Sequence, residues 1–168
     1  MIPRAIIIHH SASNRDKTTL LQLNDWHKLR WPDFKSSLGY HVGYQYFIDG
    51  KGTVYQTRKE NEVGAHTLGG WNQKSVGICL AGNFENEIPS EAQIKALAGL
   101  LEKVKQNWQI PDSQVFWHGE KWATDCCGKN LIEWIKRERM KEYSVIELMI
   151  AELRKKVAEL FRILDTKK

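Results

Sequence analysis

The sequence predicts an α/β (α+β) fold in which a central mixed β-sheet is flanked by helices. Three observations favour it: short apolar runs rich in β-branched residues, amphipathic stretches between these runs, and turn residues at their boundaries. Strands that alternate with helices along a chain are typical of a sheet covered by helices. With 168 residues, of which 42% are hydrophobic, the chain can form one domain with a real core plus an appendage.

The first strand and the first helix follow from the residue pattern. Residues 5–8 form a continuous apolar run that stops at a His-His pair, so residues 5–9 are expected to form a buried strand. Thr18 or Thr19 can cap a helix that continues to about Arg30. Pro32 then ends this helix, because proline lacks the amide hydrogen that a helix requires.

Three further strands are expected in the middle of the chain. Residues 44–49 and 53–57 are separated by Asp-Gly-Lys-Gly, which is a hairpin signal. Residues 75–81 are rich in β-branched side chains and are followed by Gly-Asn, which favours a turn. The buried cysteine of this run, Cys79, is expected to be a core thiol.

The clearest helix begins after Ser90. Ser90 and Gln93 have the spacing of a capping box, and Pro111 ends the helical pattern. Helical periodicity predicts a buried face. Its residues are Ile94, Leu97, Ala98, Leu101 and Trp108.

The last segment differs from the rest of the chain. We expect a domain of residues 1–138 and a C-terminal amphipathic, coiled-coil-like helix of residues 139–168, because apolar residues recur there at alternating spacings of three and four. These residues are Tyr143, Ile146, Ile150, Leu153, Val157, Leu160 and Leu164. The helix could complete the core, self-associate, or contact an anionic surface. From Lys141 onward, seven basic against five acidic residues are too small an excess to select a membrane, so self-association or docking is favoured.

Three short segments together predict a zinc site. His9 ends the first apolar run, His118 follows the run 115–117, and Cys126 comes eight residues later. Side chains at the carboxyl ends of neighbouring strands point into one crevice. Three protein ligands leave the fourth zinc position open to water, which is the arrangement of a catalytic site. One Zn²⁺ per chain and hydrolysis of an amide or ester are therefore expected.

The residues around the ligands suggest how the site would work. His9 and His10 cannot both face the crevice, because successive strand side chains point to opposite faces, and spacing alone does not choose between them. A helix that begins near Lys129 is expected to lower the pKa of the Cys126 thiol. Tyr44 is a candidate to donate a hydrogen bond to a developing oxyanion, and so is Thr124, two residues before the cysteine.

These motifs, in this order, resemble the zinc-dependent N-acetylmuramoyl-L-alanine amidases, which include small phage lysins and the animal peptidoglycan-recognition proteins. The resemblance covers roughly residues 2–137. It rests on His9 in Ile-Ile-His-His-Ser-Ala, Tyr44 in Gly-Tyr-Gln-Tyr-Phe, Val-Gly-Ala-His ending at His66, the run 72–80, and His118 with Cys126.

The resemblance implies a substrate, a cofactor and a set of roles. The substrate is bacterial peptidoglycan, cut at the amide between N-acetylmuramic acid and L-alanine. The zinc ligands are then His9, His118 and Cys126, and Tyr44 matches the catalytic tyrosine. Thr124 matches a position that holds lysine in some phage lysins and threonine in the recognition proteins. The family usually has proline after the ligand cysteine. This chain has Cys127 instead, which offers a competing thiolate.

Three more residues are candidates for substrate binding. His66 either touches substrate or orients a metal ligand from outside the coordination sphere. Trp71 and Asn72 could line the groove for sugar and peptide. All three residues also have a purely structural interpretation. His66 could be a packing residue, and surface loops often carry Trp and Asn without any role in catalysis.

The expected function is that of a phage-type lysin that degrades peptidoglycan. Two alternatives stay open: an intracellular amidase that recycles soluble muropeptides, and a binding module that recognises peptidoglycan without cutting it. Non-hydrolytic members of the family tend to lack the ligand cysteine, which this chain has. The apolar run at residues 5–8 is too short for a secretory signal, so synthesis in a host cytoplasm and action at the bacterial cell wall are expected.

Charge and hydropathy restrict the partners. The net charge of +5 and the pI of about 9.1 favour an anionic partner such as a wall polymer. No nucleic-acid motif accompanies this charge, so no specific nucleic-acid partner is expected. No stretch is long and apolar enough for a transmembrane segment.

Overall fold

The computed structural model describes residues 1–138, 149–150 and 152–157. The chain divides into two compact units, Met1–Ile132 and Glu133–Lys168. Every candidate site residue lies in the first unit. The expected boundary after residue 138 falls a few residues beyond this division and stays a prediction.

A five-stranded mixed sheet forms the centre of the first unit, as the sequence predicts. The strands have the order β3-β2-β4-β1-β5. Three neighbouring pairs are parallel, β2 with β4, β4 with β1 and β1 with β5, and only β2 and β3 are antiparallel. The strands are β1 (Ala5–His10), β2 (Tyr46–Ile48), β3 (Val54–Gln56), β4 (Ser75–Leu80) and β5 (Val115–Trp117).

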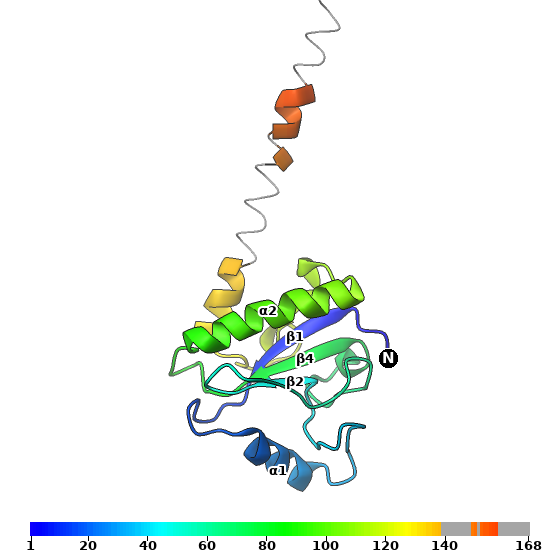
Figure 1. Ribbon diagram of the computed structural model, residues 1–168, viewed down its shortest axis with the longest axis vertical. Helices are drawn as coiled ribbons and strands as arrows, with labels where there is room; N and C mark the ends of the chain where they lie inside the picture. The colour runs from blue at the N-terminus through cyan, green and yellow to red at the C-terminus, as the bar shows by residue number, and fades with distance from the viewer. Residues whose placement is uncertain (139–148, 151, 158–168) are drawn as a thin grey trace, which may run out of the picture. The chain divides into compact units, whose positions relative to one another are not determined.

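The strand register decides which face of the sheet each side chain occupies. His9 pairs with Cys79, and Cys79 pairs with Phe47, so these three side chains share one face. Leu23 of helix α1 (Leu20–Arg30) packs in the same cluster as Phe47 and Cys79. Figure 1 shows α1 and α2 on opposite sides of the sheet. His9 therefore lies on the α1 side.

Helix α1 begins where its capping residue predicts. Thr19 is the N-cap and accepts a hydrogen bond from the Gln22 amide, while the Gln22 side chain accepts from the Thr19 amide. This reciprocal capping box satisfies two amide groups that have no partner inside the helix. The helix ends at Arg30, and Trp31 closes it with a backbone bond to His27.

Helix α2 (Glu91–Trp108) begins with the capping box that the sequence predicts. The Ser90 hydroxyl accepts from the Gln93 amide, and the Gln93 side chain accepts from the Ser90 amide. The Gln93 amide group also donates to the Ala81 carbonyl at the end of β4, at 2.8 Å. This bond connects the start of α2 to the edge of the sheet that carries the site.

The buried face of α2 differs from the predicted one. Of the five predicted residues, Leu97 is buried, Ala98 is exposed, and the others are half-buried. Positions 100 and 101 are both leucine, so the sequence is compatible with two overlapping apolar faces of the helix. Packing against the sheet selects the face that contains Leu100. The buried residues are Gln93, Leu97, Leu100 and Val104.

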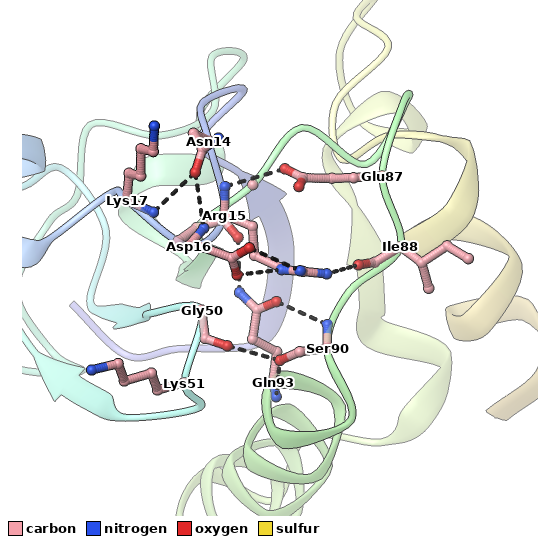
Figure 2. A network of polar contacts seen from close by, with 12 residues as sticks. Asn14, Arg15, Asp16, Lys17, Gly50, Lys51, Glu87, Ile88, Ser90 and Gln93 are labelled. Carbon is pink, nitrogen blue, oxygen red and sulfur yellow. Dashed lines mark hydrogen bonds and ion pairs between the residues drawn. The ribbon is translucent and has the colours of Figure 1, made fainter.

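The loop after β1 is held against the start of α2 by a network of polar contacts (Figure 2). The Arg15 guanidinium donates to the Ile88 carbonyl at 2.8 Å, and its backbone amide donates to the Glu87 carboxylate at 3.3 Å. The Ser90 hydroxyl donates to the Gly50 carbonyl at 2.9 Å. The two Arg15 bonds fix the segment that leaves the strand of His9, and the Ser90 bond joins the turn between β2 and β3 to the start of α2.

The remaining elements are short. Three 3₁₀ helices are η1 (Trp71–Gln73), η2 (Asp112–Gln114) and η3 (His118–Glu120). Residues 129–138 are helical, as are 149–150 and 152–157 in the second unit. Of the predicted C-terminal seam, Ile150, Leu153 and Val157 are described and exposed, and its other members lie outside the described residues. Within the described ranges, no helix has the length and apolarity to cross a membrane.

Candidate metal centre

Parallel pairing of β1 and β5 brings two of the predicted ligands together. Ile8 of β1 pairs with Trp117 of β5, and the next residues along the two strands are His9 and His118. Because parallel strands end at the same edge of a sheet, these histidines meet there. Their ring centroids are 4.4 Å apart.

The loop after η3 brings the third predicted ligand to the same place. The Gly119 amide donates to the Cys126 carbonyl at 2.7 Å, which closes the loop. The Cys126 sulfur lies 3.8 Å from Nδ1 of His9 and accepts a weak bond from the His10 amide at 3.4 Å. One ligand atom each from His9, His118 and Cys126 lies within 4.8 Å of the other two.

His10 faces away from this group, as strand alternation requires. Its Nδ1 accepts a hydrogen bond from the Phe84 amide at 3.2 Å, and its ring lies beside the Phe84 ring. The structure therefore assigns the two adjacent histidines to different faces. Cys127 is fully buried and does not belong to the cluster of ligand atoms. Its sulfur is therefore not placed to compete with that of Cys126.

The protonation of the two imidazoles suits a divalent cation. Burial, then the neighbouring His66 and His118 rings, hold the pKa of His9 well below its usual value. Burial also lowers the pKa of His118. Both imidazoles are therefore neutral near pH 7, which is the form that binds metal. Two imidazoles and one thiol form a donor set typical of zinc.

The prediction that the pKa of the Cys126 thiol is lowered is wrong for the metal-free protein. Burial raises the pKa of Cys126 to about 12, and the His10 amide opposes this only in part. Removal from water outweighs the helix that begins near Lys129. A bound cation changes this balance, because a coordinating thiol loses its proton outright.

Tyr44 lies against the candidate ligand His9, and contacts with His27 and Thr57 hold it in place. Its ring centroid is 5.0 Å from that of His9 and 5.5 Å from that of His27 on α1. Thr57 donates to the Tyr44 carbonyl at 2.8 Å. Burial, followed by the nearby Cys79 and Cys126 thiols, raises the pKa of Tyr44 well above its usual value. The phenol keeps its proton and can act as a hydrogen-bond donor.

His66 lies beside His9, not on the open surface. Its side chain is 8% exposed, and its Nδ1 is 3.1 Å from Nε2 of His9. Burial lowers the pKa of His66 to about 3, although the Ser75 backbone acts to raise it. Asn72 holds the backbone of this segment, since its Oδ1 accepts hydrogen bonds from the amides of His66 and Thr67.

Trp71 and Thr124 lie nearer to solvent. The Trp71 ring packs edge-on against Phe116, and the ammonium groups of Lys74 and Lys121 lie 4.0 and 4.8 Å from its centre. Thr124 is exposed, and its hydroxyl accepts from the Cys126 amide at 3.3 Å. Thr124 thus helps to shape the loop that holds the sulfur.

The structure adds residues that the sequence interpretation did not single out. Thr67 places its hydroxyl between His66 and His9, at 3.1 and 3.4 Å from their nitrogens. Gly77 of β4 leaves room for the His66 ring, since a Cβ there would lie 2.7 Å from it. In the sequence, only their closeness to the motifs already noted draws attention to these two residues. A threonine or a glycine by itself does not indicate which residue it contacts.

An α/β sheet with a His-His-Cys group at the carboxyl edge of its parallel strands defines the class of this protein, an α/β protein with a candidate metal centre at the sheet edge. Residues 1–129 match the family profile described as N-acetylmuramoyl-L-alanine amidase. The chain belongs to this family, whose members include peptidoglycan hydrolases and peptidoglycan-binding proteins.

Individual relatives agree with this assignment. Peptidoglycan-recognition protein SC2 of Drosophila melanogaster is 34% identical over 127 residues, which cover 74% of this chain and 68% of the relative. The endolysine N-acetylmuramoyl-L-alanine amidase LysCS from Clostridium intestinale superposes with a TM-score of 0.69 at 29% identity, over 82% of this chain and 84% of that one. A recognition-protein ectodomain complex with tracheal cytotoxin gives a TM-score of 0.68 at 26% identity, over 81% and 82%.

Proposed function

We propose that this protein is a zinc-dependent N-acetylmuramoyl-L-alanine amidase of the phage-lysin type. The observation that carries the proposal is the close approach of one ligand atom each from His9, His118 and Cys126. The similar Clostridium protein is described as an endolysine and amidase, which supports the same activity and type.

The residues around the ligands support hydrolysis of an amide. His9, His118 and Cys126 would hold the ion, which when bound supplies a Lewis acid that activates water and polarises a carbonyl oxygen. Tyr44 remains protonated beside them and can donate a hydrogen bond to the oxygen on which negative charge develops. The substrate is the bond between N-acetylmuramic acid and L-alanine in bacterial peptidoglycan.

A binding module that does not cut is the rival from another class. The complex with tracheal cytotoxin shows that a similar fold serves recognition. A complete set of three ligands favours the hydrolase, because a site built only to recognise sugar and peptide does not need a metal position open to water.

The test joins metal analysis to identification of the product. We expect one zinc per chain and new L-alanine amino termini released from intact sacculi. Cys126→Ser should weaken zinc binding by more than about 100-fold, since losing even an outer partner of a ligand costs 10–100-fold. Cys127→Ala is the matched control, because its neighbouring thiol lies outside the cluster, and it should keep both zinc and turnover.

The alternatives predict different results. Activity on soluble muropeptides but not on sacculi would indicate a recycling amidase. Zinc and peptidoglycan binding without any new amino termini would indicate a recognition module. A fully active Cys126→Ser variant would show that the ligand assignment is wrong.

A further inference from the structure

The two ring nitrogens of His9 face different partners. Nδ1 lies on the side of Cys126, 3.8 Å from the sulfur. Nε2 lies on the opposite side, 3.1 Å from Nδ1 of His66. The ring therefore has one nitrogen directed at the candidate metal position and one directed into the protein.

This geometry determines where the proton of His9 must be. A neutral imidazole that binds metal through Nδ1 carries its proton on Nε2. The nearest acceptor for this proton is Nδ1 of His66. We propose that His66 is a positioning residue, which accepts this hydrogen bond and so fixes the tautomer and the ring orientation of His9. This inference rests on the metal site of the proposed function and assigns His66 a task other than substrate contact.

The packing around His66 allows little freedom to its ring. A Cβ at Gly64 would lie 2.6 Å from the ring, and a Cβ at Gly77 would lie 2.7 Å from it. These distances are far shorter than van der Waals contact, so only glycine leaves space at both positions. The His66 amide is also held by Asn72 Oδ1 at 2.8 Å. Both the backbone and the ring of His66 are thus fixed before any metal binds.

Thr67 completes the polar environment of the pair. Its hydroxyl lies 3.1 Å from Nδ1 of His66 and 3.4 Å from Nε2 of His9. It offers the His9 proton a second, weaker acceptor within the same buried pocket. A hydrogen-bond partner behind a metal-bound histidine fixes its tautomer and direction, and loss of such a partner typically costs 10–100-fold in affinity or activity.

Two substitutions separate the hydrogen bond from the shape of the ring. His66→Phe keeps a planar ring but removes the acceptor. His66→Asn places a carbonyl oxygen about where Nδ1 of His66 lies. We expect His66→Phe to weaken zinc binding by about 10–100-fold in a chelator competition, and His66→Asn to recover most of that loss. At saturating zinc, KM for peptidoglycan should not change if His66 acts through His9 and not on substrate, so a raised KM would overturn the proposal.

Melting of the metal-free proteins provides the control for folding. Equal zinc affinities of wild type and a folded His66→Phe variant would overturn the proposal, and so would equal affinities of the Phe and Asn variants. A wild-type protein that binds no zinc would instead contradict the proposed function itself.

A measurement on the unchanged protein avoids variants that do not fold. Long-range ¹H–¹⁵N correlation spectra of the zinc-loaded wild type report which nitrogen of each histidine carries the proton. We expect His9 to carry it on Nε2, with zinc on Nδ1. Zinc bound to Nε2 of His9 would overturn the proposal, because that nitrogen could then not donate to His66.

Discussion

The Cys126 thiol shows how strongly a ligand depends on the ion it binds. Burial raises its pKa to about 12 in the metal-free protein, so the sulfur keeps its proton at neutral pH. The pKa values of His9 and His118 are lowered, so both rings have already lost their second proton. Metal binding at this site should therefore release one proton, from sulfur.

This leads to a prediction for the pH dependence of zinc binding. Between about pH 7 and 9, the solution pH lies below the metal-free pKa of Cys126 and above the pKa of both imidazoles. The apparent affinity should rise at least about tenfold for each pH unit, because the Cys126 proton leaves for each ion bound. Chelator competition at several pH values measures the slope. A slope near zero would mean that the thiolate is already formed before zinc arrives.

Tyr44 is the residue whose loss should separate binding from catalysis. Its hydroxyl lies outside the proposed ligand set of His9, His118 and Cys126, whereas its ring packs against His9. Tyr44→Phe keeps the ring and removes the donor. We expect the variant to remain folded with unchanged zinc content, while kcat falls roughly 10²- to 10³-fold, as for the loss of one oxyanion donor. Unchanged turnover of sacculi would exclude a catalytic role for the hydroxyl.

At the scale of single elements, capping and strand composition made the fold predictable. Thr19 and Ser90 cap their helices through bonds to residues three positions on, and such local geometry is visible in a sequence. The strand limits are less predictable: the residue pattern predicts an extended segment over 44–49, but β2 contains only Tyr46–Ile48. Hairpin signals locate the turn but not the last paired residue.

The buried face of α2 provides a test with two adjacent leucines. Leu100 is 6% exposed, whereas Leu101 is only half-buried. Leu100→Ala should lower the free energy of unfolding by about 2–5 kcal/mol, because it leaves a cavity in the core. Leu101→Ala should cost clearly less. Urea unfolding of both variants measures the difference. A larger cost at Leu101 would restore the face predicted from periodicity.

At the scale of the whole molecule, the two compact units raise the question of what the C-terminal segment does. Ile150, Leu153 and Val157 carry the predicted seam in the described part of that segment, and all three are exposed. We expect these apolar residues to be covered in solution by a second copy of the chain, because heptad spacing favours pairing of helices.

Removing this segment tests that expectation. A chain that ends at Glu138 should sediment as a monomer, while the full chain should sediment as a larger species in analytical ultracentrifugation. Because every candidate ligand precedes residue 133, the shorter chain should keep its zinc. Equal monomeric masses for the two proteins would remove the coiled-coil interpretation.

The sequence by itself determined the order of the elements, their caps, and the three residue types that suit a zinc ion, because these depend on local pattern and on the chemistry of each side chain. Strand spacing did not choose between His9 and His10, and the family resemblance named His9. Only the tertiary structure brought His9 together with Cys126, selected the buried face of α2, and showed that His66 lies behind His9. These depend on strand register and on contacts between residues more than fifty positions apart. A local pattern cannot encode distances of that kind, because they are fixed only when the whole sheet assembles.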